Sequence, residues 1–244
     1  MREEGTSPRA SSIPRAILVF AVACALLAIL RFEGMALGCV LVRPIAPLLD
    51  PRMHRHAGWV LAHVVLLFAV PLVLARIGLK EKPENLGVGI GDARRWGRVT
   101  LGLLPLVVIS AAILSRVPGV AAHYRAHTAG ISGIEGWIGW IGMWGAAFFA
   151  WEFFFRGLLV VGLAQDLGGP AAVVLHLVPF TLVHVGKPAL EVLLTVPGGL
   201  VFGALAFRGR SMLGPFLLHW ALGASLDLFV ARSVSALPSI ASGG

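Results

Sequence analysis

The chain has 244 residues, of which 57% are hydrophobic and only 13% are charged, and its mean hydropathy is +0.86. A soluble domain averages about 25% charged residues, so this composition excludes an ordinary soluble globular protein and indicates a polytopic helical membrane protein. The net charge of +8 comes mainly from arginines near segment ends, which is typical of membrane-topology bias. No basic stretch is interleaved with aromatic residues in the manner of a nucleic-acid footprint, and we expect no nucleic-acid partner.

The chain begins with a polar segment, residues 1–13, whose composition predicts a disordered tail. The first predicted span covers residues 14–30 and is interpreted as a retained anchor, because no small-residue cleavage site precedes a soluble domain. A second apolar run, residues 35–49, contains Pro44 and Pro47. At roughly 15 residues it is shorter than the ~20 of a full span, so it is either an eighth span or a segment that crosses only part-way.

Residues 57–79 form a convincing span, followed by a polar linker whose stretch 76–98 carries six Lys/Arg residues. We expect this linker to be cytoplasmic, and the N-terminus to share that side only if residues 35–49 do not cross. A loop is predicted at 116–134. The remaining spans are predicted at 100–114, 136–163, 170–185, 190–207 and 213–230. The fold class is therefore an all-α transmembrane bundle of seven or eight spans, with N-terminal transmembrane helices at 14–83, a core at 84–232 and a C-terminal tail at 233–244.

The last four apolar segments carry an unusual set of ionisable residues. Glu152 and Arg156 lie four residues apart and therefore share one helix face. Ionisable groups in a membrane are expensive and usually mark function. The pair is either an intrahelical ion pair that fixes the bundle, or a carboxylate that is oriented by the arginine and activates water as a general base.

His184 and His219 lie on two later segments. A lone histidine is usually a structural hydrogen-bonding residue, but two of them with Glu152 form a set in which one activates water and another stabilises an oxyanion. The same three residues match a His₂Glu zinc set, although no HExxH motif supports it. Glu191 follows a GKP break and is either a capping acid or a site residue. His176 is interpreted as a structural residue. Asp227 is interpreted either as an acid that supports the site or as an acid at the end of its helix.

These residues resemble the CPBP (CAAX protease and bacteriocin-processing, or Abi) family of intramembrane proteases. The family pattern is EExxxR, then FxxxH, then a histidine followed four residues later by Asn or Asp. Here the order and spacing match over residues 84–232, with Glu152–Phe153–Phe154–Phe155–Arg156, then Phe180 to His184, then His219. Two positions depart from the pattern, because Trp151 replaces the first glutamate and Gly223 replaces the Asn or Asp.

The resemblance implies an intramembrane endopeptidase that hydrolyses a peptide bond near the membrane in a membrane-anchored protein or peptide, for example in a C-terminal anchor or sorting signal. In that case Glu152, with Glu191 as a stand-in for the missing glutamate, and His184 activate water, His219 stabilises the oxyanion and Arg156 holds the carboxylate. No cofactor is required, with a divalent metal such as zinc as the alternative. The preference for arginine over lysine favours a bacterial inner (cytoplasmic) membrane, whose lipid is then a partner.

The two departures keep a second hypothesis open. With Trp151 and Gly223 in place of the family residues, the chain is alternatively a catalytically inactive family member that acts as a membrane scaffold, an immunity factor or a regulatory factor. A transporter or proton relay is a third hypothesis, motivated by the intramembrane acids and histidines. The lack of an internal repeat and the fixed motif spacings argue against it.

Overall fold

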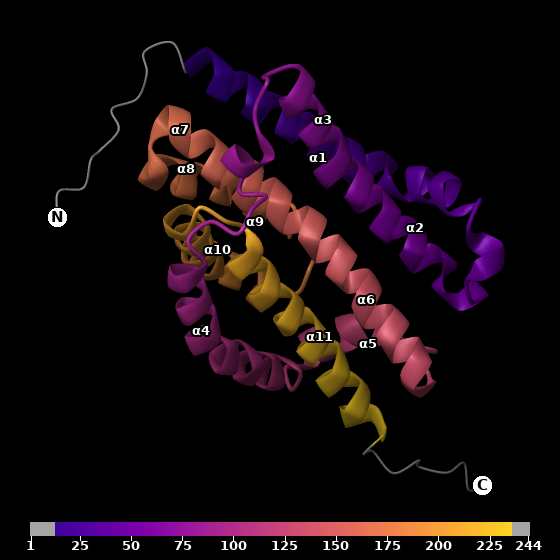
Figure 1. Cartoon of the computed structure of the whole chain (residues 1–244). Helices are drawn as coiled ribbons and strands as arrows, with labels where there is room; N and C mark the ends of the chain where they lie inside the picture. Colours follow the sequence, from indigo (N-terminus) through magenta and orange to yellow (C-terminus); the bar gives the residue numbers. More distant parts are fainter. Residues whose placement is uncertain (1–12, 236–244) are drawn as a thin grey trace, which may run out of the picture.

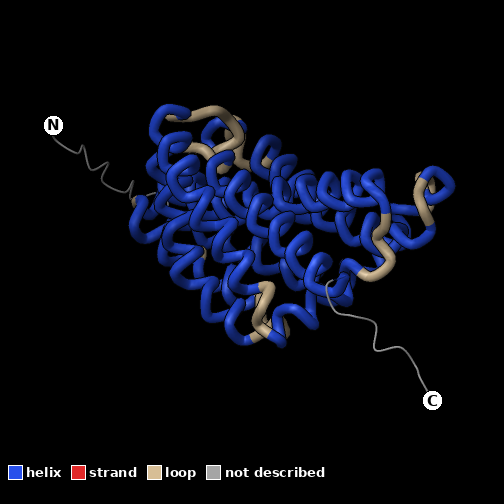
Figure 2. Tube along the Cα trace, turned by 90° about the horizontal axis from the view of Figure 1, so that it is seen from below, coloured by secondary structure: helices blue, strands red, loops and turns tan. Residues whose placement is uncertain are grey.

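The computed structural model describes residues 13–235, and every regular element in this part of the chain is helical (Figures 1 and 2). The α-helices are α1 (Ile13–Val42), α2 (His54–His63), α3 (Val70–Ile77), α4 (Ala93–Leu114), α5 (Pro118–Thr128), α6 (Gly133–Glu152), α7 (Leu163–Leu167), α8 (Gly169–Leu175), α9 (Leu177–Leu182), α10 (Ala189–Gly209) and α11 (Leu213–Ser235). Two wide-turn π-helices, η3 (Val64–Ala69) and η5 (Phe153–Gly162), join α2 to α3 and α6 to α7. Three short 3₁₀ turns are η1 (Ala46–Leu48), η2 (Pro51–Met53) and η4 (Pro83–Leu86). The all-α fold class is confirmed.

Within the described residues, six helices are long and apolar enough to cross a membrane. They are α1, α2 continued through η3 and α3, α4, α6 continued through η5 and α7, α10 and α11. The segment predicted at 170–185 is present as two shorter helices, α8 and α9, over Gly169–Leu182. Large apolar side chains such as Leu101, Ile109 and Ile113 point outward from α4, as expected for helices that face lipid rather than water. The chain is an integral membrane protein.

Helix α1 corrects the prediction for the first fifty residues. The runs at 14–30 and 35–49 were expected to be separate, but one helix continues from Ile13 to Val42. The charged side chains of Arg31 and Glu33, between the two runs, are exposed and leave the backbone hydrogen bonds intact. The helix ends two residues before Pro44, which disfavours helical geometry at the residue before it. The eighth span is therefore absent.

Helices α1 and α2 form an antiparallel hairpin that lies along one side of the bundle (Figure 1). The two helices cross at a pair of glycines, because a Cβ on Gly38 would lie 2.4 Å from the backbone oxygen of Gly58. Small residues of this kind let membrane helices approach closely. At the start of α1, Arg15 forms ion pairs with Glu81 and with Asp166. These contacts place the beginning of α1 at the same end of the bundle as the polar linker.

The segment predicted as a loop at 116–134 contains helix α5, which was missed. Its first residue is Pro118, whose fixed φ and missing N–H suit the first position of a helix. The mixture of His, Tyr and Arg in this short helix masks any apolar periodicity. Consequently, polar side chains that the sequence assigns to a loop lie on a helix, α5, that packs against the bundle.

The polar linker is held against the protein rather than projecting from it. Leu86 is buried, and the Gly87 carbonyl oxygen accepts a hydrogen bond from the Met212 N–H at 3.1 Å. The Asp92 N–H donates to the Gly209 carbonyl, and the Asp92 side chain caps α4 by accepting from the Arg95 N–H at 3.0 Å. The linker therefore packs against the turn between α10 and α11.

The helix formed by α6, η5 and α7 runs through the middle of the bundle. In Figure 1 it lies between the α1–α3 side and α11, with α4 beyond α11. Seventy-eight per cent of its most apolar stretch is buried, compared with 11% for α4. The core around it includes Phe153, Phe154, Phe155 and Leu159. Apart from Ile13 in α1 and residues 233–235 in α11, the predicted tails at 1–13 and 233–244 lie outside the described residues.

Candidate active site

Glu152 and Arg156 lie in the buried centre of the bundle, and both side chains are 0% exposed. The Arg156 Nη1 donates to Glu152 Oε1 at 3.1 Å, so the predicted shared face is confirmed as a buried ion pair. The same Oε1 atom lies 2.5 Å from His219 Nδ1 on α11. A ring nitrogen that faces a carboxylate carries the proton, so the other ring nitrogen of His219 has a free lone pair when the ring is neutral. The three residues thus form one hydrogen-bonded unit.

Arg156 is held in place by aromatic rings as well as by Glu152. Its guanidinium carbon lies 4.1 Å from the centre of the Phe180 ring and 5.5 Å from that of Phe202. Such cation–π contacts stabilise a desolvated guanidinium by about 2 kcal/mol. The first turn of η5 carries this arginine, and π-helical turns are frequent at functional sites. The arginine is therefore fixed relative to both α9 and α10.

His184 lies just beyond the C-terminal end of α9. Its Nδ1 is 2.7 Å from the Phe180 carbonyl oxygen, so Nδ1 carries the proton and the second ring nitrogen is an acceptor in the neutral ring. The ring packs on Phe180 at 4.8 Å and meets Trp151 edge-on, with centroids 5.7 Å apart. Glu152 bonds to His219 and not to His184, which differs from the pairing that the resemblance implies.

Trp151 occupies the position of the missing family glutamate and lies between two histidines. Its ring is stacked with His63 of α2 at 6.0 Å and is perpendicular to His184. His63 is buried and bonds through Nδ1 to the Trp59 carbonyl at 2.8 Å. Over residues 13–235, the Trp151 indole nitrogen is buried and has no hydrogen-bond partner. The N-terminal hairpin thus contributes a histidine ring beside the site.

Gly223, the second departure, faces the ring of Phe148. A Cβ at Gly223 would lie 2.6 Å from a carbon of that ring. Phe148 also packs on His219, with ring centroids 4.3 Å apart. An aromatic ring therefore fills the space into which an Asn or Asp side chain at position 223 would project.

Glu191 is engaged in a separate cluster. Its carboxylate accepts hydrogen bonds from Lys187 Nζ at 2.6 Å and from the Tyr124 hydroxyl at 3.0 Å. Burial and the nearby Glu191 carboxylate raise the pKa of Tyr124 well above its ordinary value. Tyr124 comes from the missed helix α5, and the sequence offers no signal that it approaches Glu191. The backbone connects this cluster to the site, because the Lys187 N–H donates to the His184 carbonyl at 3.0 Å.

His176 and Asp227 are both buried, and each has a bonding pattern of its own. His176 Nδ1 lies 2.7 Å from the Val173 carbonyl oxygen, and its ring lines the place where α10 passes closest, at Gly203. Asp227 accepts a hydrogen bond from the Trp140 indole at 2.7 Å. Trp140 lies near the beginning of α6, whereas Glu152, to which His219 bonds, is its last residue. Asp227 therefore bonds to α6 and not to His219.

The set Glu152, His184 and His219 does not have the geometry of a metal site. Among the described residues, no group of three His, Cys, Asp or Glu side chains is placed so that it could hold a metal ion. Glu152 instead has its Oε1 shared by Arg156 and His219, while Oε2 is buried without a partner within residues 13–235. This oxygen is free to accept a hydrogen bond from a water or a substrate group.

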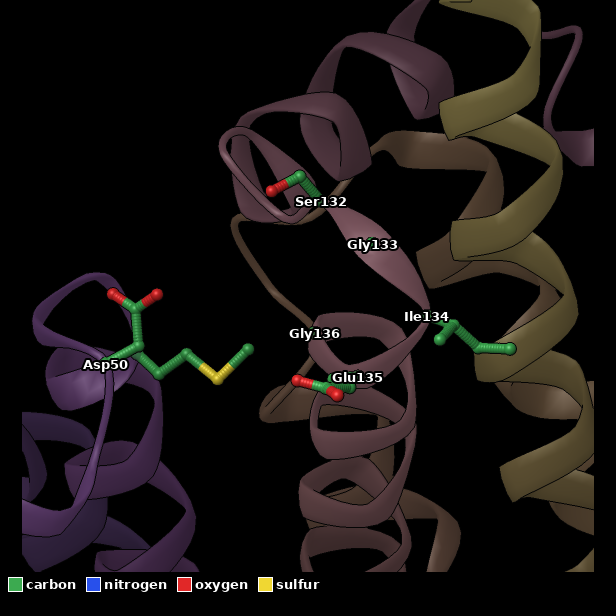
Figure 3. Close-up of a pocket in the computed structure, with 7 residues that line it drawn as sticks. Asp50, Ser132, Gly133, Ile134, Glu135 and Gly136 are labelled. Carbon is green, nitrogen blue, oxygen red and sulfur yellow. The ribbon is translucent and has the colours of Figure 1, made fainter.

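A hollow at the surface lies away from these residues (Figure 3). It has a volume of about 560 Å³ and is formed between the α1–α2 connection and the start of α6. Figure 3 shows the Asp50 side of the hollow facing the loop that leads into α6. Its lining residues are Asp50, Met53, Ser132, Gly133, Ile134, Glu135 and Gly136. The hollow therefore has acidic residues on both sides but none of the predicted catalytic residues.

The comparisons with known proteins agree with the motifs. Residues 133–225 match the model of a family described as type II CAAX prenyl endopeptidase Rce1-like. No curated protein and no solved structure matches the chain. The matched segment contains Glu152, Arg156, His184 and His219, whereas His63 and Tyr124 lie outside it. Residues 133–225 are therefore similar to the CAAX protease family, which agrees with the CPBP resemblance that the motifs indicated.

Proposed function

We propose that the protein is an intramembrane endopeptidase that hydrolyses a peptide bond near the membrane surface in a membrane-anchored protein. The observation that carries this proposal is the buried unit in which Glu152 bonds to His219 at 2.5 Å while Arg156 neutralises the carboxylate. A structural ion pair has no need of the histidine. A carboxylate that fixes the orientation of an imidazole is, in contrast, the arrangement that makes a histidine an efficient general base.

In the proposed reaction, a water molecule attacks the scissile carbonyl carbon and its proton passes to the free ring nitrogen of His219. The tetrahedral intermediate then breaks the C–N bond, and the same proton passes to the leaving amine. The Glu152 carboxylate stabilises the imidazolium that forms transiently. Arg156 donates a hydrogen bond to the same carboxylate and places a positive charge beside it. No metal or other cofactor takes part in these steps.

His184 has the second acceptor nitrogen at the site. Its Nδ1 is committed to the Phe180 carbonyl, so the other nitrogen can hold the attacking water in position. The resemblance assigns water activation to this histidine and oxyanion stabilisation to His219. The bond between Glu152 and His219 favours the opposite assignment for the base, because a base needs the orienting carboxylate. Replacing each histidine separately distinguishes the two assignments through the pH dependence of kcat.

Substrate and location follow from the same proposal. We expect the substrate to carry a membrane anchor, for example a C-terminal anchor or sorting signal, since a site inside the bundle is reached most readily from the lipid. The six Lys/Arg residues of the stretch 76–98 favour a cytoplasmic position for the linker. The N-terminal end of α1 would share that side through the ion pairs of Arg15. A bacterial cytoplasmic membrane remains the proposed location.

A catalytically inactive scaffold or regulatory protein is the second candidate function. It is favoured by the Phe148 ring, which fills the space beside Gly223 where the family has a polar side chain. Under this alternative, the buried unit serves only to join η5 to α11. Alanine variants of Glu152, His184 and His219 would then retain full biological activity if they fold.

The experiment uses purified protein in liposomes with a panel of membrane-anchored peptides that have candidate bonds near either bilayer surface. We expect cleavage by the natural chain, loss of cleavage in Glu152→Ala, and no loss in Glu135→Ala, whose exposed carboxylate is on the same helix. A chelator arm tests metal dependence, and we expect cleavage to persist. Loss of cleavage with the chelator would move the mechanism to a His₂Glu metal site. Full cleavage by Glu152→Ala would contradict the proposed chemistry.

A further inference from the structure

Peptide hydrolysis places negative charge on the carbonyl oxygen, and the enzyme must supply a hydrogen-bond donor for it. The resemblance assigns oxyanion stabilisation to His219 and a polar side chain to position 223, but neither position offers a free donor here. Gly223 has no side chain, and the Nδ1 proton of His219 is used by Glu152. The other ring nitrogen of His219 must be unprotonated in order to accept the proton of water. It therefore has no proton of its own to donate to the carbonyl oxygen when the attack begins. The reaction under the proposed function therefore requires a donor from elsewhere.

Buried N–H groups without a partner are the candidates for this donor. Within residues 13–235 they include the indole nitrogens of Trp144 and Trp151 and two nitrogens of Arg156. Trp144 lies two turns before Trp151 on the same helix. Its ring packs on His56 and Trp59 of α2, and its indole faces the buried Asp227. Arg156 is enclosed by phenylalanine rings and neutralises Glu152. Trp151 alone among the three adjoins both Glu152 in the chain and the His184 ring in space.

The surroundings of Trp151 hold its ring in a defined orientation. His63 is stacked on it with an interplanar angle of 25°, while His184 is at 87° to it. Phe155 packs on a further side, with ring centroids 4.9 Å apart. An indole N–H can only donate, and a buried donor without a partner is costly unless a substrate group or water completes it. A rigid, unpaired donor beside the proposed water-binding histidine is preorganised for a developing oxyanion.

We propose that the Trp151 indole N–H is the oxyanion donor of this enzyme, and that His63 of the N-terminal hairpin positions the indole by stacking. The proposal rests on the proposed function and adds a catalytic role for the residue that replaces the family glutamate. It also gives the hairpin a part in the site, although the hairpin lies outside the matched segment 133–225. The departure at position 151 then compensates for the departure at position 223.

The test is Trp151→Phe, which removes the N–H and keeps an aromatic ring. We expect kcat on a cleaved peptide to fall by about 10²–10³-fold, the effect of losing one oxyanion donor, while KM changes little. The affinity for a peptide phosphonate, which resembles the tetrahedral intermediate, should fall by a similar factor. Trp144→Phe is the matched control, because it removes a buried indole N–H from the same helix that faces Asp227 rather than His184. It should leave kcat and phosphonate affinity unchanged.

A second variant covers the case in which Trp151→Phe does not fold. Incorporation of 3-benzothienylalanine at position 151 replaces the N–H with sulfur and preserves the shape of the ring. Unchanged kcat and phosphonate affinity in either folded variant, with cleavage lost in Glu152→Ala, would overturn the role of Trp151 and leave the proposed function intact. Absence of cleavage of every peptide by the natural chain would instead count against the proposed function, and the inference would fall with it.

Discussion

Within residues 13–235, Glu152 is the only carboxylate bonded to Arg156, and both side chains are fully buried. Replacing Glu152 with glutamine keeps the size of the side chain but leaves the guanidinium without a counter-charge. Removal of one partner from a buried ion pair destabilises a protein by about 3–5 kcal/mol, because the other charge stays desolvated and unpaired. The cation–π contacts with Phe180 and Phe202 compensate for only part of this loss. We therefore expect Glu152→Gln to lower the free energy of unfolding by several kcal/mol.

The measurement is reversible unfolding of the purified protein in mixed micelles with increasing SDS, followed by circular dichroism. Glu191→Gln is the control, since its ion pair with Lys187 is partly exposed and should be worth no more than about 1 kcal/mol. The double variant Glu152→Gln/Arg156→Met removes both charges and should recover most of the stability. Equal unfolding midpoints for the natural chain and Glu152→Gln would refute this view of the buried pair.

Two further predictions concern the surroundings of the site. Gly157→Ala should destabilise the protein by about 1–3 kcal/mol, because the new Cβ would lie 2.5 Å from the Leu86 carbonyl oxygen. The control Gly97→Ala should not destabilise the protein, because its Cβ meets nothing within 4 Å. Equal SDS unfolding midpoints for the two variants would contradict the packing of the linker on Gly157. Burial and Glu191 raise the pKa of Tyr124 above its unfolded value, so the stability that this shift provides is complete below an unfolded pKa of about 10 and is lost as pH rises above it. Tyr124→Phe should remove that alkaline loss, and an identical pH profile for the variant and the natural chain would contradict the assignment.

The sequence predicts those parts of the structure that depend on local pattern. The four-residue spacing of Glu152 and Arg156 requires a shared helix face, and the ion pair is present. Apolar runs of sufficient length predict the spans because the bilayer requires each backbone polar group to be bonded within its own segment. The two apolar runs at 14–30 and 35–49 were expected to be separate, but the exposed charges of Arg31 and Glu33 between them interrupt the apolar pattern without interrupting the helix.

The arrangement of side chains between helices could not be predicted in the same way. Glu152 bonds to His219 rather than to His184 because of the way α11 and α9 pack on η5. The spacing of the motifs does not predict this packing. The same is true of Tyr124, whose contact with Glu191 joins segments 67 residues apart. The motif residues on three helices predict that a site exists, whereas the pairing within it follows only from the packed bundle.

The most direct test of the central claim is a double-mutant cycle between Glu152 and His219 on kcat for a cleaved peptide. The variants are Glu152→Gln, His219→Gln and the double variant, each checked for folding by SDS unfolding. If the carboxylate acts through the imidazole, each single change should lower kcat by about 10²–10⁴-fold, and the double variant should be no slower than the slower single variant. If the loss of kcat in the double variant equals the product of the two single losses, the residues act independently. That result would contradict the Glu152–His219 unit as the water-activating group.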